Sequence, residues 1–233
     1  MTNKLFCFGL GFSARLIARA LQAEGWKIAG TTRSTDKAQQ LKSEGIEPFI
    51  FADDRPIADI ASALDGVTHV LSSAPPGGQG DPVIHHHGGD LASLPTGTWI
   101  GYLSTTGVYG DWGGAEVTEE DDLLPSGKRG RRRVAAEKAW FDLGRRHDLC
   151  VQSFRLAGIY GPGRNALETV RSGRARRIVK PGQVFSRIHV EDIARTVLAS
   201  IKQPNCGAAY NVCDDDAAPP QDVIAHACGL LGV

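Results

Sequence analysis

The chain has 233 residues, with 26 basic and 26 acidic side chains, so its formal net charge is zero. Hydrophobic residues make up 42% and charged residues 22%, a balance typical of globular proteins that excludes a disordered chain. The neutral balance gives no general attraction to nucleic acid or to anionic membranes, and no apolar run approaches the roughly 18–20 residues that span a bilayer.

The cysteines are few and scattered, and no two of them form a CxxC pair. They are Cys7, Cys150, Cys206, Cys213 and Cys228. This usage predicts reduced, buried thiols in a cytosolic protein. The N-terminus leads straight into a strand-like run without a signal-peptide pattern, which also favours a cytoplasmic chain.

Short apolar runs alternate with helical patterns along the first 160 residues. Strands are predicted at 5–8, 26–31, 48–52, 68–72, 99–103 and 150–156. Helices are predicted at 13–24, 35–44, 57–64 and 134–143. Beyond residue 160 the pattern loosens, with a helix expected at 190–201, a strand at 208–212 and a helix at 221–231. This alternation predicts a doubly wound parallel α/β sheet.

The sharpest motif is a GxGxxA sequence that follows the first predicted strand and opens the first predicted helix. Gly9 permits a tight turn, Gly11 lets a pyrophosphate approach the backbone, and Ala14 lets the helix pack closely on the strand. The helix N-terminus offers free N–H groups to phosphates. Dinucleotide contacts are therefore expected from Gly9, Gly11, Phe12, Ser13 and Ala14. The alternative is an ordinary glycine-rich turn.

The end of the second predicted strand indicates which dinucleotide binds. NAD sites place an acidic residue there for the ribose 2′-OH, whereas this chain has Thr32, Arg33 and Ser34, and the first acid after the strand is Asp36. A guanidinium pairs with a 2′-phosphate, and the two hydroxyls donate hydrogen bonds to it. We therefore expect NADP rather than NAD. The alternative is that Arg33 is a solvated loop charge.

Several ordered motifs together resemble the short-chain dehydrogenase/reductase superfamily. The likeness is greatest to the extended and atypical branch that includes NAD-dependent epimerase/dehydratases acting on nucleotide sugars. Besides the glycine motif, it rests on SAPP at 73–76, LSTTGVYG at 103–110, RLAGIYGPG at 155–163, RIHVEDIA at 187–194 and YNV at 210–212. It implies a Rossmann-like doubly wound sheet with a small C-terminal substrate cap. Residues 1–160 would then form the NAD(P)-binding domain and residues 161–233 the last sheet elements and the cap, with a soft boundary that allows a single domain.

The resemblance also implies positions around the cofactor. Asp53 would lie by the adenine. Residues near the ribose would be Ser73, Ala74 and Pro75. Residues near the nicotinamide carboxamide would be Leu156, Ala157, Gly158 and Ile159.

The catalytic pattern of the family is broken in this chain. Thr105 stands at the position of the catalytic Ser/Thr, although a strand-end threonine can instead bond to its own backbone. Aligning the Ala-Glu pair at 136–137 places Arg129 at the tyrosine position and Arg133 at the lysine position of Tyr-x-x-x-Lys. Arg133 can still hold a ribose hydroxyl or a phosphate. Arg129 cannot replace tyrosine, because a guanidinium stays protonated and accepts no hydrogen bond.

Three substitutes for the missing tyrosine remain open. Tyr109 is one candidate acid/base, with a packed turn aromatic as its alternative. Tyr160 is a weaker candidate. Arg129 can instead polarise a carbonyl while water carries the proton.

Two further charged features have simpler interpretations. The basic run 128–133 is balanced by acids at 116–122, so nucleic acid is not an expected partner. Consecutive histidines at 85–87 point in different directions on a helix, so we expect a surface helix start and no metal. The basic stretch 171–180 lies in the substrate-facing region of the family, which suits a phosphorylated or acidic ligand or, equally, a solvated loop.

Taken together, the motifs predict an NADP-binding protein, and the resemblance implies an oxidoreductase or epimerase whose substrate is a nucleotide sugar or a related carbonyl or alcohol compound. The alternative is an NADP-binding sensor or regulator without turnover. The resemblance implies a homodimer paired through the helix carrying Trp140 and predicts no membrane partner. Family members usually continue beyond the position of Val233, so either this cap is minimal or a tail is missing from the sequence.

Overall fold

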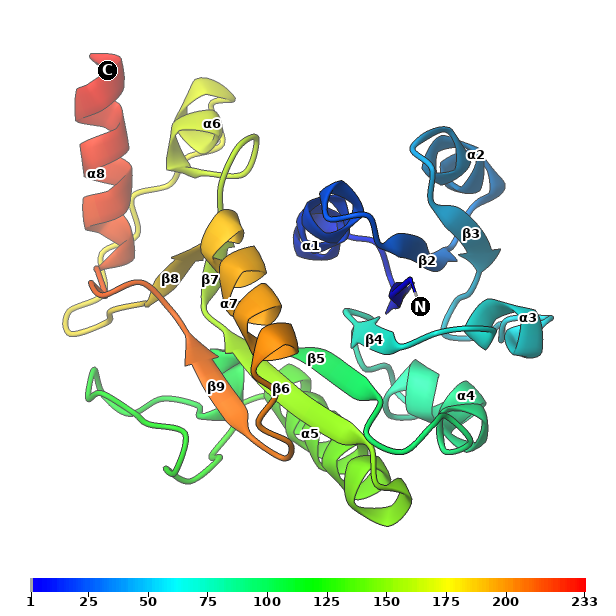
Figure 1. Ribbon diagram of the computed structural model, residues 1–233. Coiled ribbons are helices and arrows are strands. Elements are labelled where there is room, and N and C mark those ends of the chain that lie inside the picture. The colour runs from blue at the N-terminus through cyan, green and yellow to red at the C-terminus, as the bar shows by residue number, and fades with distance from the viewer. Residues whose placement is uncertain (1) are drawn as a thin grey trace.

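The computed structural model describes residues 2–233 and is built on a seven-stranded parallel sheet in the order β3-β2-β1-β4-β5-β6-β9 (Figure 1). The strands are β1 Lys4–Phe8, β2 Lys27–Thr32, β3 Glu47–Ile50, β4 His69–Ser72, β5 Trp99–Thr105, β6 Cys150–Leu156 and β9 Ala209–Val212. The chain winds outward from β1 in both directions, so the strand order reverses between β1 and β4. This arrangement confirms the predicted doubly wound sheet, whose ligand-binding crevice is expected at that reversal.

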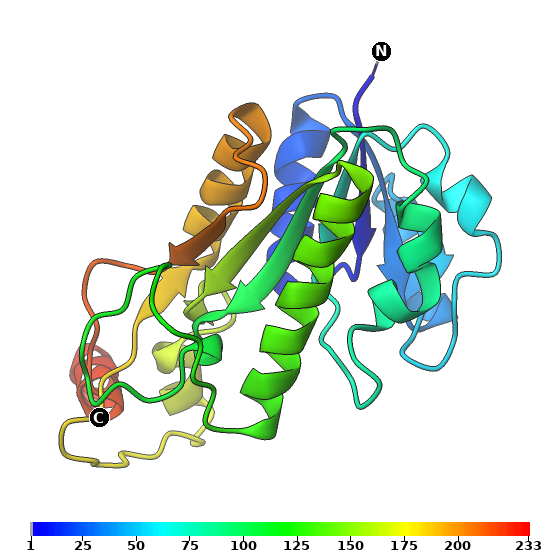
Figure 2. The same cartoon turned by 90° about the horizontal axis from the view of Figure 1, so that it is seen from below.

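Helices cover both faces of the sheet (Figure 2). One face carries α1 Phe12–Ala23, α2 Thr35–Ser43 and α7 Val190–Lys202. The opposite face carries α3 Ile60–Leu64, α4 Pro82–Leu91 and α5 Lys128–His147. A short 3₁₀ turn, η1, covers Thr106–Val108 after β5. Both faces are therefore shielded from water, as a parallel sheet requires.

Alternate residues of β1 divide the core into its two halves. Leu5 and Cys7 pack with the α1 and α7 side, and Phe6 and Phe8 pack with the α4 and α5 side. All four side chains are fully buried. Successive strand residues point to opposite faces, so the continuous apolar run LFCF buries both faces at once.

Helix α5 is longer than the sequence pattern predicts. The expected helix covered 134–143, whereas α5 runs from Lys128 to His147. Arginines fill the first turn of α5, so it shows no apolar pattern. Gly130 in this turn packs closely against the loop after β5, where an added Cβ would lie 2.8 Å from the Gly107 carbonyl oxygen. The helix ends at Asp148, whose φ of 53° is left-handed. Tertiary contact, rather than an amphipathic stripe, fixes the N-terminal turn.

The chain from residue 158 onward contains three elements that the sequence did not predict. Strands β7 Gly158–Tyr160 and β8 Arg187–His189 form a small parallel sheet, and α6 Ala166–Arg171 lies between them in the chain. Helix α8 Pro220–Leu231 packs against α6. Elements of three to six residues carry too few positions to show a period, which is why pattern alone missed them.

The expectation of reduced, buried thiols holds only for Cys7: two cysteines are oxidised and two free ones are not buried. Cys150 and Cys206 form a disulfide, 56 residues apart in sequence, with a Cα–Cα distance of 4.5 Å. Of the other three, Cys7 is buried, Cys213 is exposed and Cys228 is intermediate. Parallel pairing of β6 with β9 brings the disulfide partners together, and this proximity is not visible in their spacing.

The histidine run lies on α4, but not entirely at the surface as predicted. His87 is buried, its Nε2 accepts the Ile57 N–H at 3.0 Å, and its Nδ1 lies 3.0 Å from an Asp90 carboxylate oxygen. The helix begins at Pro82, earlier than the run itself, because the buried Asp81 caps it. Across residues 2–233, every helix is too short or too polar to cross a membrane.

A buried ion pair joins α5 to the sheet. Arg155 on β6 donates to Glu137 Oε1 from Nε at 2.9 Å and from Nη2 at 2.6 Å. Ser104 on β5 donates to the other carboxylate oxygen at 2.7 Å. Burial opposes the charge of Arg155, yet Glu137 outweighs it and holds the guanidinium pKa above its ordinary value. Three elements are thereby fixed around a single carboxylate.

This arrangement predicts strong coupling between the two charged residues. Replacing Glu137 by Met, or Arg155 by Met, leaves an unpaired buried charge and should lower the free energy of unfolding by about 3–5 kcal/mol. The double variant removes both charges and should lose clearly less than the sum of the single losses. Urea unfolding of the four proteins measures the coupling, and strictly additive losses would contradict the ion pair.

Candidate functional site

The glycine turn after β1 ties three strands together. Gly9 has a φ of +87°, a conformation that favours glycine, and its N–H donates to Thr31 Oγ1 of β2 at 2.7 Å. Ser73, which follows β4, donates from its hydroxyl to the Gly9 carbonyl oxygen at 2.7 Å. A Cβ on Gly9 would lie 2.8 Å from that hydroxyl. The carboxyl ends of β1, β2 and β4 therefore meet at one residue.

The N-terminus of α1 is open toward this meeting point. Gly11 caps the helix without a side-chain hydrogen bond, and a Cβ built on it would meet no atom within 4 Å. Ser13 and Ala14 are buried, where they pack α1 onto the sheet, while Phe12 is 38% exposed. The unpaired N–H groups and positive end of α1 thus face free space.

A cation lies beside this helix start. The Arg164 guanidinium carbon is 5.6 Å from the centroid of the Phe12 ring. A tight turn holds Arg164, with backbone hydrogen bonds in both directions between it and Gly161. Sequence reasoning did not single out Arg164, although it directly follows the GPG motif at 161–163.

The residues predicted to choose the dinucleotide lie together at the end of β2. Arg33 is exposed, and its backbone carbonyl oxygen accepts from Arg55 at 3.2 Å. The Ser34 hydroxyl caps α2 by accepting the Lys37 N–H at 3.4 Å, so part of its hydrogen-bonding capacity is used locally. Thr32 and Lys37 line a shared hollow beside Arg15 of α1. The region is rich in cations and hydrogen-bond donors.

The predicted adenine and ribose positions lie on the next loops of the same edge. Asp53 is exposed, and its carboxylate lies against the glycine loop after β4, 2.6 Å from where a Cβ on Gly77 would stand. Ala74 is buried and Pro75 is exposed. These positions bring the loops after β3 and β4 into contact.

The predicted nicotinamide positions follow β6. Leu156 and Ala157 are buried, and the Ala157 N–H donates to the Val212 carbonyl oxygen of β9 at 3.0 Å. Gly158 is exposed and Ile159 is half-buried within β7. This segment therefore turns away from the main sheet at the carboxyl end of β6.

Thr105 ends β5 with a hydroxyl that already has one partner. Its Oγ1 accepts the Gly107 N–H at 3.2 Å, which is the local backbone bond that the sequence alternative described. The side chain is only half-buried. Since a hydroxyl can donate and accept at the same time, this bond leaves its proton for a second partner.

The two arginines predicted to stand at the tyrosine and lysine positions of Tyr-x-x-x-Lys differ in environment. Arg129 is exposed in the first turn of α5. Arg133 donates from Nη1 to the Tyr102 hydroxyl at 2.9 Å and to the Leu103 carbonyl oxygen at 3.0 Å. Its guanidinium also lies 5.5 Å from the centre of the Tyr102 ring. Arg133 is therefore bound to β5 in this structure.

Tyr109 belongs to a buried hydrogen-bond network that includes Arg155 and Asn211. Its hydroxyl donates to Asn211 Oδ1 at 2.7 Å and accepts from Arg155 Nη1 at 2.7 Å. Burial raises the pKa of its phenol, and the opposing effect of Arg155 does not restore the ordinary value. At neutral pH the phenol is therefore protonated. This environment fits the packed-aromatic alternative better than a general base.

Sequence reasoning missed the network of Ser104, Glu137 and Arg155 that supports this region. One signal was available, because Arg155 is a charged residue inside the otherwise uncharged strand CVQSFRL. A charge in a strand covered on both faces needs a buried partner of opposite sign.

An acidic hollow of about 540 Å³ opens beyond β7 and β9. Its lining includes Asp192, the run Asp214–Asp216, and Tyr160, whose hydrogen bond to Asp214 raises the pKa of the phenol. The Asp214 carboxylate also accepts the His189 N–H at 3.3 Å. Within residues 2–233, no group of three or more His, Cys, Asp or Glu has a metal-binding arrangement.

Comparison with known proteins places this geometry in context. The family model described as "NAD dependent epimerase/dehydratase family" matches residues 97–213, half of the chain. Protein YeeZ of Escherichia coli (strain K12) is 26% identical over 228 residues, covering 91% of this chain and 77% of YeeZ.

Solved structures share the fold over nearly the whole chain. A functionally unknown conserved protein from Silicibacter pomeroyi is 48% identical, with a TM-score of 0.89, covering 100% of this chain and 79% of that one. UDP-glucuronic acid 4-epimerase from Bacillus cereus, in complex with UDP-glucuronic acid and NAD, is 15% identical, with a TM-score of 0.79 and coverage of 99% and 83%. The dTDP-glucose 4,6-dehydratase of Bacillus anthracis, in complex with NAD, is 18% identical, with a TM-score of 0.80 and coverage of 100% and 82%.

The extent of the family match, together with the glycine turn at the strand reversal, leads to one conclusion: this chain belongs to the NAD dependent epimerase/dehydratase family.

Proposed function

We propose that this protein binds a nicotinamide dinucleotide, NADP in preference to NAD, and acts as an oxidoreductase or epimerase on a carbonyl or alcohol compound. The open N-terminus of α1 above Gly11 carries the proposal. It lies at the strand reversal, it has no capping side chain, and no protein atom fills the space that a Cβ on Gly11 would enter. A pyrophosphate fits such a place, since backbone N–H groups and the helix dipole both favour an anion there.

Residues of this chain are suited to hold each part of the dinucleotide. Gly9 and Gly11 permit close approach of the pyrophosphate, and Arg164 adds a positive charge beside it. Asp53 and the loop after β4 are suited to the adenosine, and the segment after β6 to the nicotinamide.

The preference for NADP rests on charge at the end of β2. Arg33 is exposed there, with Lys37 and Thr32 close by in the chain, and no carboxylate lies between the end of β2 and Asp36. A 2′-phosphate carries up to two negative charges, which a guanidinium binds with paired hydrogen bonds. A carboxylate at the same place would repel it.

The bound dinucleotide would supply hydride transfer. Thr105 is suited to donate its hydroxyl proton to a substrate oxygen at the carboxyl end of β5. Arg129, exposed at the start of α5, can polarise a carbonyl but cannot remove a proton. Water is then the proposed proton carrier, since Tyr109 is buried with its hydroxyl engaged on both sides.

The proposed substrate class is a nucleotide sugar. The structural neighbour MoeE5 forms complexes with UDP-glucuronic acid and with UDP-glucose, each also with NAD, and the Bacillus cereus epimerase forms one with UDP-glucuronic acid and NAD. In this chain the acidic hollow disfavours a phosphate group, so the diphosphate of such a substrate would lie along the basic segment 171–180.

A sensor or regulator without turnover is the second candidate. The fixation of Arg133 on β5, together with an arginine at the tyrosine position, favours it. In that case the dinucleotide would bind as described but undergo no chemistry.

Replacing Gly11 by Val tests the dinucleotide site directly. The side chain would occupy the proposed pyrophosphate space without touching protein, so NADP affinity should fall at least about tenfold while unfolding stability changes little. Gly127, which also caps a helix in extended backbone with open space around it, gives the matched control Gly127→Val. Calorimetric titration that found unchanged affinity in Gly11→Val would remove the basis of the proposal.

Replacing Arg33 by Ser should separate the two dinucleotides. NADP should bind about tenfold more weakly or worse, because a charge-assisted hydrogen bond is lost, while NAD binding should change little. Arg146→Ser, at an exposed position near the far end of α5, is the control. Equal losses for NADP and NAD would mean that Arg33 does not contact a 2′-phosphate.

Turnover distinguishes the enzyme from the sensor. With NADP bound, the enzyme should change absorbance at about 340 nm, or isomerise product, with at least one member of a carbonyl and sugar-nucleotide panel. Thr105→Val should then lower kcat by about a hundredfold without weakening NADP, whereas Thr106→Val should not. If Arg129 merely replaces a lost acid, Arg129→Tyr should raise turnover. A silent panel with NADP bound would favour the sensor.

A further inference from the structure

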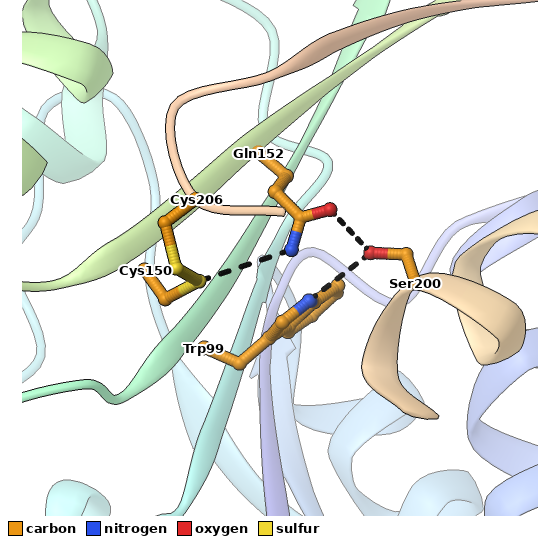
Figure 3. Close-up of a disulfide and its surroundings, with 5 residues drawn as sticks. All are labelled: Trp99, Cys150, Gln152, Ser200 and Cys206. Carbon is orange, nitrogen blue, oxygen red and sulfur yellow. Dashed lines mark hydrogen bonds between the residues drawn. A yellow bond between two sulfur atoms is a disulfide. The ribbon is translucent and has the colours of Figure 1, made fainter. Parts of the chain in front are cut away.

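The disulfide between Cys150 and Cys206 lies at the opposite end of the sheet from the proposed dinucleotide site. Cys150 is the first residue of β6 and is buried, whereas Cys206 is exposed in the loop that leads into β9 (Figure 3). The two sulfurs therefore differ in access: a thiol from solution can reach Cys206 and is screened from Cys150.

The disulfide fastens the last strand of the sheet. Strand β9 is the edge, paired with β6 from Ser153↔Ala209 onward. Just before this pairing, the Gly207 N–H donates to the Val151 carbonyl oxygen at 2.7 Å. The covalent link and this hydrogen bond together hold the N-terminal end of β9, a strand of four residues.

The other end of β9 reaches the functional region. Asn211 accepts the Tyr109 hydroxyl, and its own N–H donates to Glu119 Oε1 at 2.5 Å. Val212 accepts the Ala157 N–H at 3.0 Å. Strand β9 thus connects the disulfide to residues that border the proposed site.

A chain of hydrogen bonds ends at the buried sulfur. Trp99 Nε1 donates to the Ser200 hydroxyl at 3.2 Å, and Ser200 donates to Gln152 Oε1 at 2.8 Å (Figure 3). These bonds orient the Gln152 amide, whose N–H group points at Cys150 Sγ, 4.0 Å away. An amide donor aimed at a sulfur stabilises negative charge that develops on it, so Cys150 is the favoured leaving sulfur.

We propose that Cys150–Cys206 is a thiol–disulfide exchange site that a dithiol reductant attacks at Cys206, and that its reduction releases the edge strand β9. The attacking thiolate forms a bond to Cys206 Sγ, the Sγ–Sγ bond breaks, and its electron pair goes to Cys150 Sγ, which takes up a proton. The second thiol of the reductant then displaces Cys206. Two electrons and two protons pass to the cysteine pair, and the reductant becomes a disulfide.

The test uses the full chain purified without reductant, with dithiothreitol as the probe. Mass spectrometry should find the pair oxidised. Reduction should raise amide hydrogen exchange in residues 206–213 by about tenfold or more and leave β1 unchanged. Cys206→Ser should match the reduced protein with or without dithiothreitol, and Cys228→Ser should keep the full response.

Two further readouts test the direction of attack. Iodoacetamide added during brief reduction should trap a mixed disulfide between the reductant and Cys206 with the label on Cys150, because attack at Cys206 frees the Cys150 thiol first. Gln152→Met, which removes the donor at Cys150, should slow reduction several-fold. Free thiols at both positions in the purified protein, unchanged exchange on reduction, or a mixed disulfide trapped on Cys150 with the label on Cys206 would each overturn the proposal. None of these measurements depends on dinucleotide binding.

Discussion

The arrangement of the strands at the carboxyl end of this sheet depends on the turn at Gly9. Its N–H is held by Thr31 of β2, and its carbonyl oxygen is held by Ser73 after β4. Because these strands flank β1 on opposite sides, one residue with a left-handed φ aligns three carboxyl ends. A larger residue there would strain the backbone and strike the Ser73 hydroxyl, so both bonds would be disturbed together. The open start of α1 above Gly11 follows from this turn, since the chain enters the helix directly from it.

The neighbouring half of the site depends on a different interaction, the ion pair of Glu137 and Arg155. It fixes α5 against β5 and β6, and through Tyr109 it reaches β9. Such a pair costs desolvation energy, which its surrounding hydrogen bonds offset, and it specifies where the charged groups must meet. The register of α5 is consequently set although its N-terminal turns hold arginines such as Arg129 and Arg133 in place of an apolar stripe.

Sequence reasoning was most successful where a local pattern is long. The run LFCF and the α1 stripe at 14–21 predicted the central strand, the first helix and the parallel class of the sheet. It failed where distant contacts decide. Neither the Cys150–Cys206 pairing nor the burial of His87 has a local signature, because each arises when separate segments meet. For the site, the GxGxxA motif predicted the open glycine turn. The hydrogen bonds from Arg133 to Tyr102 and Leu103 depend on how α5 lies on β5, and nothing in the local sequence indicates them.

The division of the site into two independently held halves bears on how function can diverge in this fold. The glycine turn, Arg33 and Arg164 belong to β1, β2 and the segment after β7, and none of them bonds to Arg129 or Arg133 among residues 2–233. Substitution at the start of α5 therefore changes the groups exposed at that end of the sheet without disturbing the hydrogen bonds of the glycine turn. Arg133 also bonds to β5, which stabilises the helix start. Under the proposed function, such a chain would keep dinucleotide binding while its chemistry changes, and the difference between enzyme and sensor would lie in what Arg129 and Thr105 present to a substrate.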